Sequence, residues 1–371
     1  MIRVDFENRR RIAEAANGEP YKCFQCGTCT VNCVLGDVIP VRREIRYIQL
    51  GVVPSDGGIW RCVTCNFCRS QCPSDVDIAA IFRGLRRINY DEKRSPEELN
   101  EVLWRVYEEG NPLGSPRGER FTWLNRLMAN PNPDVLIYTC CLAAYDKRGQ
   151  DILNKLIDIL NKAGLEVGVF RDGSCCGDIV YHIGDDYFYE EIVNENVEKL
   201  ENLKPSVVLT VSPHVYHNLV NLYPRYGGKI SAKVMHHTQF LYEIINEGRL
   251  KPNKLDARLT YHDPCYLARY NGIVEEPRGI IEAIDGIDFV EMLHNKYETL
   301  CCGGGGGGIW TENMEARRAT RDRLMEVAEA ETDTMVTSCP YCIRMFEDEA
   351  KVMGSDIKVL DVIDVLHSSL G

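Results

Sequence analysis

The sequence predicts a multi-domain α/β protein in which a helical N-terminal module precedes two copies of one α/β unit. With 371 residues, the chain is too long for a single hydrophobic core. Three landmarks recur at nearly constant offsets of 124, 126 and 127 residues, namely Cys141 and Cys265, Cys175 and Cys301, and Ser212 and Cys339. Constant offsets indicate a duplicated unit. The predicted parts are the N-terminal module at 1–92, a linker at 93–133, and the two copies at 134–254 and 255–371.

Composition restricts the class of protein further. The chain holds 17 cysteines and has a net charge of −12. The cysteines gather in Cys-x-x-Cys runs, which are typical of metal sites and not of a secreted disulfide scaffold. The acidic balance argues against a nucleic-acid partner. Neither a signal peptide nor a transmembrane run of about 18 apolar residues is visible. We therefore expect a cytoplasmic redox protein that avoids oxygen and has no transmembrane segment of its own.

Two cysteine quartets occupy the N-terminal module. They read Cys23-x-x-Cys26-x-x-Cys29-x-x-x-Cys33 and Cys62-x-x-Cys65-x-x-Cys68-x-x-x-Cys72-Pro73. This spacing matches the bacterial ferredoxin run, in which the fourth cysteine of each run binds the other cluster. We predict two [4Fe–4S] cubanes, one held by Cys23, Cys26, Cys29 and Cys72, the other by Cys62, Cys65, Cys68 and Cys33. Two structural zinc sites are the alternative, but zinc usually takes two separated Cys-x-x-Cys knuckles per metal.

Helical apolar stripes connect and follow the quartets. One stripe consists of Val41, Ile45 and Ile48, and Gly51 can end that helix; a second consists of Ile78, Ile81, Phe82 and Leu85. The long helical connection resembles the ferredoxin module found in iron–sulfur subunits of heterodisulfide reductase and of succinate dehydrogenase. The basic residues of both helices are expected on solvated faces, with docking of an acidic partner as the minor alternative: Arg42, Arg43, Arg46, Arg83, Arg86 and Arg87.

The linker contains charged residues, prolines and glycines around an amphipathic stretch from Leu99 to Tyr107. We expect Trp104, Phe121 and Trp123 to pack it against the body of the protein.

Buried-strand patterns alternate with helices in both copies. In the first copy they are Val135–Tyr138, a helix capped by Asp151 and ended at Gly164, Leu165–Phe170 and Val207–Val211; in the second they are Leu259–Tyr261, Phe289–Met292 and Met335–Ser338. This alternation predicts a mostly parallel sheet in each copy, with the cysteines in loops at the strand ends. His236 and His237 fit a strand-to-helix junction and receive no further role.

The second copy carries Cys265, the adjacent pair Cys301 and Cys302, and Cys339-Pro-Tyr-Cys342. Adjacent cysteines do not readily form an unstrained disulfide with each other. Both can face one inorganic cluster, because the glycine run 303–308 frees the backbone to bend and to bring its N–H groups close. The pattern itself predicts a metal cluster.

The stretch from Thr260 to Phe346 resembles the cysteine-rich CCG domain of heterodisulfide reductase catalytic subunits. The resemblance implies that five cysteines hold a non-cubane [4Fe–4S] cluster at which a disulfide is bound and cleaved: Cys265, Cys301, Cys302, Cys339 and Cys342. His262 and Asp263 are candidates for tuning that cluster or delivering protons, with an ordinary polar turn as the alternative. Arg269 and Tyr270 are candidates for contact with an anionic substrate.

The first copy lacks the final cysteine pair, since Ser212-Pro-His-Val215 stands in its place. A hydroxyl and an isopropyl group cannot replace two thiolates. The cysteines that remain are Cys140, Cys141, Cys175 and Cys176, which could hold a cubane, a zinc ion or, as we expect, nothing. Alternatively, His214 or His217 could complete a mixed-ligand site.

We interpret the chain as an iron–sulfur oxidoreductase subunit resembling heterodisulfide reductase. Electrons would pass through two cubanes to the non-cubane cluster for disulfide reduction or dithiol oxidation of a small substrate. No nucleotide-binding fingerprint follows a strand, so the electrons must come from or go to another subunit, a flavoprotein or a membrane cytochrome. Such a partner could hold the chain at the inner face of the membrane. The alternative is a non-catalytic electron-transfer subunit between such a partner and another enzyme.

Overall fold

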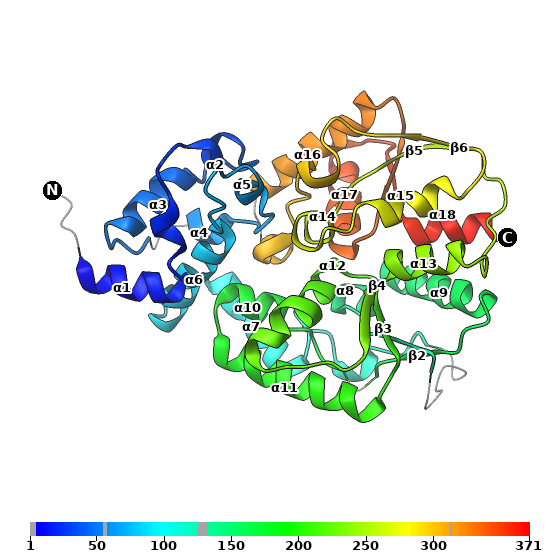
Figure 1. Ribbon diagram of the computed structural model, residues 1–371, viewed down its shortest axis with the longest axis horizontal. Helices are drawn as coiled ribbons and strands as arrows, with labels where there is room; N and C mark the ends of the chain where they lie inside the picture. The colour runs from blue at the N-terminus through cyan, green and yellow to red at the C-terminus, as the bar shows by residue number, and fades with distance from the viewer. Residues whose placement is uncertain (1–4, 55–57, 125–132, 172, 312–313) are drawn as a thin grey trace.

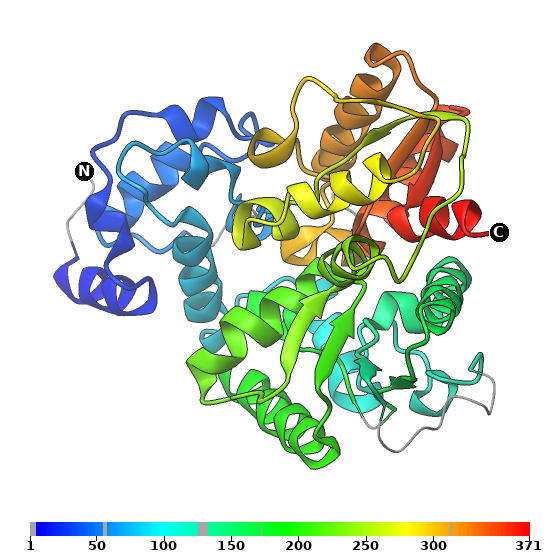
Figure 2. The same cartoon turned by 45° about the vertical axis from the view of Figure 1, so that its right-hand side comes forward.

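The protein consists of three parts that meet around a common centre (Figures 1 and 2). The computed structural model describes residues 5–54, 58–124, 133–171, 173–311 and 314–371, and for 314–316 only the backbone element. The N-terminal helices, blue in Figure 1, lie beside the second α/β unit, yellow to red, with the first unit, green, next to both. None of the helices in these described ranges combines the length and apolar character needed to cross a membrane.

The N-terminal module is helical, as its apolar stripes predict. Its helices are α1 (Phe6–Ala15), α2 (Thr28–Val31), α3 (Val41–Gln49), α4 (Gly58–Arg61), α5 (Phe67–Ser70) and α6 (Ile78–Asp91). The stripe of α3 is buried, and the helix ends before Gly51, whose φ of 84° is left-handed. Asp77 caps α6 by accepting a hydrogen bond from the Ala80 N–H.

Two four-stranded parallel sheets with the same strand order form the body. The first unit contains β1 (Val135–Ile137), α8 (Cys141–Tyr145), α9 (Lys147–Lys162), β2 (Val167–Val169), α10 (Asp178–Ile183), α11 (Asp186–Leu203), β3 (Val207–Thr210), α12 (Pro213–His217), β4 (Lys233–His236) and α13 (His237–Asn246). The second contains β5 (Ala257–Tyr261), α14 (Cys265–Asn271), α15 (Glu275–Glu282), β6 (Ile287–Val290), the turn η7 (Gly305–Trp310), α16 (Met314–Glu329), β7 (Thr334–Thr337), α17 (Pro340–Met353), β8 (Lys358–Asp361) and α18 (Val362–Ser369). The orders β2-β1-β3-β4 and β6-β5-β7-β8 confirm the duplicated α/β unit.

Some local expectations differ from the structure. Asp151 lies inside α9, because the helix begins four residues earlier and Asp146 caps it by accepting from the Arg148 N–H. His236 is the N-cap of α13, in agreement with the predicted strand-to-helix junction.

The predicted linker contains helix α7 (Glu97–Glu109), whose buried side chains join the core shared by both α/β units: Leu99, Val102, Leu103 and Val106. Phe121 and Trp123 pack against that core, but Trp104 is 59% exposed, so its expected packing was wrong. Residues 125–132 of the linker lie outside the described ranges.

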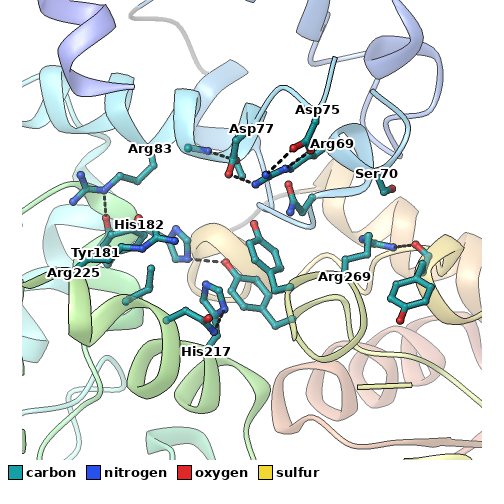
Figure 3. Close-up of a pocket in the computed structure, with 18 residues that line it drawn as sticks. Arg69, Ser70, Asp75, Asp77, Arg83, Tyr181, His182, His217, Arg225 and Arg269 are labelled. Carbon is teal, nitrogen blue, oxygen red and sulfur yellow. Dashed lines mark hydrogen bonds and ion pairs between the residues drawn. The ribbon is translucent and has the colours of Figure 1, made fainter. Parts of the chain in front are cut away.

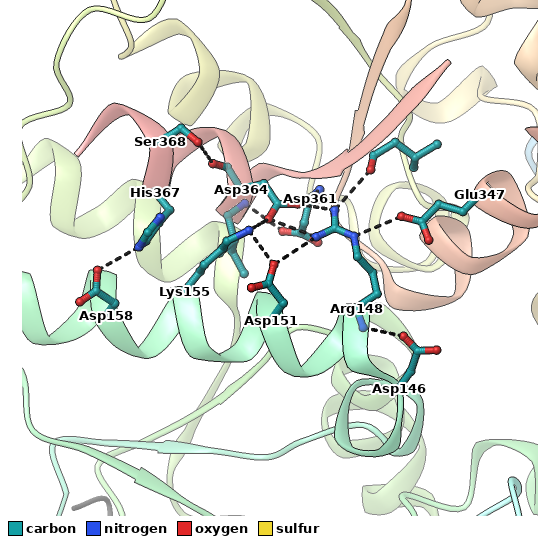
Figure 4. Close-up of polar contacts among 12 residues, drawn as sticks. Asp146, Arg148, Asp151, Lys155, Asp158, Glu347, Asp361, Asp364, His367 and Ser368 are labelled. Atoms are coloured by element: carbon teal, nitrogen blue, oxygen red, sulfur yellow. Dashed lines mark hydrogen bonds and ion pairs between the residues drawn. The ribbon is translucent and has the colours of Figure 1, made fainter. Parts of the chain in front are cut away.

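The two α/β units are joined by an ion network around Arg148 on α9 (Figure 4). Its guanidinium donates to Asp364 at 2.5 Å and to Glu347 at 3.1 Å, both in the second unit. Lys155 also donates to Asp364, at 2.8 Å. These donors hold the pKa of Asp364 below its usual range, although burial alone would raise it.

Arg86 on α6 joins all three parts and is 1% exposed. Its guanidinium donates to five carbonyl oxygens, those of Ile59 (2.9 Å), Trp60 (3.1 Å), Cys62 (2.7 Å), His182 (3.4 Å) and Gly306 (2.8 Å). Arg83 is also mostly buried and pairs with Asp186. The expectation of a solvated face was therefore wrong for these two arginines, because the first α/β unit covers that side of α6.

Candidate functional site

The five cysteines of the second unit gather at one edge of its sheet. Cys265 opens α14 directly after β5, Cys339 caps α17 after β7, and the pair Cys301–Cys302 follows β6. The carboxyl ends of parallel strands share an edge, which brings these loops together. All five thiols are buried, and Cys342 Sγ lies 3.3 Å from Cys302 Sγ.

Backbone donors surround these sulfurs. The Gly303 N–H donates to Cys301 Sγ at 3.3 Å, and the Gly304 N–H donates to Cys302. Gly303 has a φ of 87°, which a residue with a side chain rarely adopts. Hydrogen bonds from Cys301, Cys342 and this backbone hold the pKa of Cys302 far below its usual range. Buried thiols with N–H donors and one stabilised thiolate fit an iron–sulfur cluster, whose ligands are thiolates.

The N-terminal quartets are interleaved in space. Burial raises the pKa of Cys29, and the charges of Cys23, Cys26 and Cys72 raise it further. Burial, followed by the charges of Cys65 and Cys62, raises the pKa of Cys33 to about 12. Cys72 thus lies near the first quartet and Cys33 near the second. An exchange of fourth ligands between the two runs would require this proximity, and the ligand roles themselves stay predictions.

The second quartet reaches the five-cysteine group. A hydrogen bond from the Cys301 thiol lowers the pKa of Cys65 to about 6. The glycine run packs on the same segment, since a Cβ added to Gly305 would lie 2.4 Å from the Val63 oxygen. Glycine is required at this contact because no side chain fits between the two backbones.

Helix α14 holds the second quartet from the other side. Tyr270 Oη donates to the Thr64 oxygen at 2.8 Å, and Arg269 Nε donates to the Cys65 oxygen at 2.7 Å. The Arg269 Nη2 group is buried without a partner in the described ranges. The negative charges of Cys65, Cys265 and Cys301 raise the pKa of Arg269 against the effect of its burial. Contact of these two side chains with an anionic substrate stays a prediction.

His262 and Asp263 have defined structural partners. Arg323 Nε donates to His262 Nδ1 at 3.1 Å, and Arg278 forms two hydrogen bonds to Asp263, at 2.7 and 2.9 Å. Burial and then the charge of Arg323 hold the pKa of His262 far below its usual range. A neutral His262 favours an orienting role over proton donation, and neither role is tested by these contacts.

The four cysteines of the first unit are buried around Arg120, which donates to Cys141 Sγ at 3.6 Å. Burial raises the pKa of Cys140 to about 12. Ser212 serves as the N-cap of α12 and accepts from the Val215 N–H at 3.4 Å. Across the described part of the chain, no three His, Cys, Asp or Glu side chains are placed to hold one metal ion. Whether the four cysteines of this unit hold a cluster, a zinc ion or nothing stays a prediction.

A group of residues that the sequence did not reveal lies between the units. Asp178 of α10 lies 3.2 Å from His214 Nδ1 and 3.6 Å from His182 Nε2. The His214 ring stacks on Tyr266 with 4.0 Å between centroids and is tilted against Tyr341 with 4.5 Å between centroids. His214 and Tyr341 are equivalent positions of the two copies, 127 residues apart. The only sequence signal for this contact was that His214 and Tyr341 occupy matching positions in the two copies.

A cavity of about 470 Å³ opens beside this group (Figure 3). Its walls come from all three parts, including Arg69 of the N-terminal module, His182 and Arg225 of the first unit, and Arg269 of the second. His182 Nε2 lies 2.8 Å from Tyr266 Oη, so the cavity wall connects directly to the buried group.

Comparison with known proteins agrees with this architecture. The family model described as "Cysteine-rich domain", CCG, matches residues 135–219 and 259–347, one match in each α/β unit. The "EtfAB:quinone oxidoreductase" of Syntrophomonas wolfei is 31% identical, with 90% of this chain and 49% of that protein covered. The chain thus spans about half the length of this relative.

Two further likenesses cover most of the chain. A subunit of the dihydromethanophenazine:CoB–CoM heterodisulfide reductase of Methanosarcina barkeri is 28% identical, with 84% of this chain and 77% of that protein covered. A crystal structure of a hypothetical protein from Helicobacter pylori superposes with a TM-score of 0.57 at 10% identity, over 99% of this chain and 73% of that one. The latter shows the fold alone. The chain thus carries two cysteine-rich CCG domains and is similar to iron–sulfur oxidoreductases, among them a heterodisulfide reductase subunit.

Proposed function

We propose that this chain is a redox subunit in which two N-terminal cubanes exchange electrons with a non-cubane cluster on the five cysteines of the second unit. The observation that carries the proposal is the packing of α14, which begins at Cys265, on the second quartet, where Arg269 Nε donates to the Cys65 oxygen at 2.7 Å. Two predicted cluster sites held together in this way offer a short path for single electrons. The reaction served would be the reduction of a small disulfide, or the oxidation of two thiols in reverse.

Burial of the cysteines supports a direction along this path. Cys26 of the first quartet is exposed, whereas the second quartet is partly buried and the five-cysteine group is fully buried. A partner subunit with a flavin or haem would therefore meet the first cubane. The buried non-cubane cluster would supply electrons, and a site for sulfur, to the substrate. The chain's own residues would exclude water and hold the protons that the reaction consumes.

A second candidate is an electron-transfer subunit without a substrate of its own. It is favoured by the 31% identity to a protein named EtfAB:quinone oxidoreductase, a name that joins an electron-transferring flavoprotein to a quinone. The loss of the final cysteine pair in the first unit agrees with either candidate.

Iron content tests the cluster assignments. Protein purified without oxygen should contain about twelve irons, four for each cluster. The variant Cys301→Ser should lose about four of them. Cys140→Ser is the matched control, because Cys140 is an equally buried thiol in the first unit and should leave the count unchanged. About sixteen irons, together with a loss in Cys140→Ser, would instead indicate a fourth cluster in the first unit.

Electron paramagnetic resonance separates the two candidate functions. In a catalytic subunit, adding a small thiol to the oxidised protein should change a signal that Cys301→Ser lacks. If protein with its full iron content shows signals that do not change when thiols or disulfides are added, the catalytic role is refuted and the electron-transfer role is left.

A further inference from the structure

The first cysteine quartet reaches the protein surface at Cys26. Cys26 is the one exposed thiol among the 17 cysteines of the chain, all of which lie within the described ranges. It borders a surface hollow of about 530 Å³, which we name the Cys26 hollow. The hollow is lined by residues of α2 and α3, helices of the N-terminal module that Figure 1 shows at one end of the molecule. Its lining includes Cys26, Gly27, Val31, Pro40, Arg42 and Arg43.

Two large apolar side chains near Cys26 are exposed to water. Val31, the last residue of α2, lines the hollow and is 85% exposed. Phe24 lies between Cys23 and Cys26 in the chain and is 63% exposed. Burial of these side chains against a second protein would remove apolar area from water, which favours association. Interfaces of electron-transfer proteins are small, so a few such side chains form a large share of the contact.

The ionic side chains that line the Cys26 hollow are two arginines, with no aspartate or glutamate among the lining residues. The Arg42 guanidinium has no ion pair or hydrogen bond to any residue in the described ranges, and its stem covers Gly27, where an added Cβ would lie 3.4 Å from Arg42 Cδ. Arg43 pairs with Glu44 at 3.0 Å, but the Glu44 side chain is only 3% exposed and offers no negative charge to a partner. This surface is therefore cationic on a chain with a net charge of −12.

A backbone contact fixes the two sides of the hollow. The Arg42 N–H donates to Thr30 Oγ1 at 2.9 Å, which joins the first turn of α3 to α2. Thr30 directly precedes Val31, so the cationic and the apolar side chains keep their places beside Cys26. A cationic rim with an apolar contact is complementary to an acidic protein surface, and charge complementarity of this kind speeds the encounter of two proteins.

We propose that the Cys26 hollow is the docking surface of an acidic protein that carries single electrons. The inference rests on the proposed function, because Cys26 can pass electrons only as the ligand of a cluster. In each encounter one electron passes between the carrier and the proposed first cubane, so one is oxidised as the other is reduced, and no atom is transferred. The exposed Cys26 favours a redox protein over an anionic lipid surface, since a lipid surface has no electron to exchange.

The test measures the affinity of the iron-loaded full chain for flavodoxin, an acidic single-electron carrier, by calorimetry without oxygen. The variants are Arg42→Glu and Val31→Ser. Arg105→Glu is the matched control, because it makes the same charge change at a 47% exposed arginine of α7, outside the N-terminal module. A glutamate in the first turn of α3 suits the helix dipole, so Arg42→Glu should fold. Iron content and circular dichroism should match the wild type in every variant.

The charge and the apolar contact should differ in their response to salt. Arg42→Glu should weaken flavodoxin binding about 10-fold at low salt, and most of this difference should vanish at about 1 M salt, where charges are screened. Val31→Ser should weaken binding roughly 3-fold at both salt concentrations, because apolar contact is not screened. Arg105→Glu should change neither affinity. Reduction of the iron–sulfur absorbance by reduced flavodoxin should also slow about 10-fold in Arg42→Glu. Dithionite, a small reductant, should reduce every variant fully.

The outcomes separate the docking surface from the function on which it rests. A chain without clusters, or with clusters that dithionite does not reduce, refutes the proposed function and the inference with it. A loaded chain that binds flavodoxin with equal affinity in the wild type and in Arg42→Glu refutes the docking surface alone. Binding to anionic lipid vesicles without binding to flavodoxin refutes it as well. So does a higher affinity for cytochrome c, a basic electron carrier, than for flavodoxin.

Discussion

Replacing Arg86 with methionine should destabilise the protein severely, because one side chain holds three parts of the chain together. The guanidinium donates to five carbonyl oxygens, three of them within 2.9 Å. Methionine leaves these buried acceptors without donors. Hydrogen bonds to a charged group contribute roughly 1.5–3 kcal/mol each, and removing the buried charge recovers part of that sum. We expect a net loss of about 4 kcal/mol.

The matched control is Arg87→Met on the same helix. Arg87 pairs with Asp186 at 2.9 Å, but its side chain is 47% exposed, so its loss should cost at most about 1 kcal/mol. Both variants would be unfolded in urea without oxygen and followed by circular dichroism. For a chain of this size, 4 kcal/mol corresponds to a midpoint shift of about 1 M. Equal shifts in Arg86→Met and Arg87→Met would refute the reasoning.

Three further predictions follow from the contacts between the parts. Arg148→Met should lower the free energy of unfolding by about 2 kcal/mol, because its ion pairs with Asp364 and Glu347 are lost. Arg344 is half exposed, so Arg344→Met should change that free energy by less than about 1 kcal/mol. Equal urea midpoints for the two variants would contradict this prediction. Gly306→Ala should destabilise the folded protein by about 3 kcal/mol and weaken magnetic coupling between the proposed clusters, because its Cβ would lie 2.5 Å from the Cys62 oxygen. Gly118→Ala, which has open space around it, should change neither the stability nor the coupling. Unchanged coupling in Gly306→Ala would argue against the contact. Burial lowers the pKa of His217 to about 4, so the folded state binds fewer protons than the unfolded state between pH 6.5 and 4. The contribution of this neutral histidine to stability is complete above pH 6.5, and about 3 kcal/mol of the free energy of unfolding should be lost on acidification. Urea unfolding at each pH should show this loss in the wild type and not in His217→Gln. Parallel pH profiles of the two proteins would show that His217 is not the responsible group.

The elements that depend on local periodicity could be predicted from the sequence. Helix α6 and strand β3 follow from apolar spacing, and the common sheet order follows from the constant offsets between the copies. The N-cap of α9 was predicted at the wrong residue because Asp146 and Asp151 are both suitable caps. The helix includes the turn with Gly149, and the burial of Gly149 is visible only in the folded structure.

The contacts between the parts could not be predicted in the same way. Arg86 looked like a surface residue because its burial depends on Gly306, 220 positions away. The ring contact of His214 with Tyr341 likewise needs both copies placed face to face. A single chain carries no local signal for contacts at such separation. The cysteine groups were visible because inorganic clusters impose their own spacing on the ligands.

The small core of the N-terminal module includes Cys265, Tyr266 and Cys301 from the second α/β unit. These cysteines are buried by a neighbouring part of the chain as well as by their own fold. For the proposed cluster to form, iron and sulfide must reach the thiols before that neighbour closes over them. Maturation of the protein should then be ordered in time, with the proposed cluster of the second unit assembled first and the N-terminal module docking last. A chain that folds completely without iron would bury its own loading site.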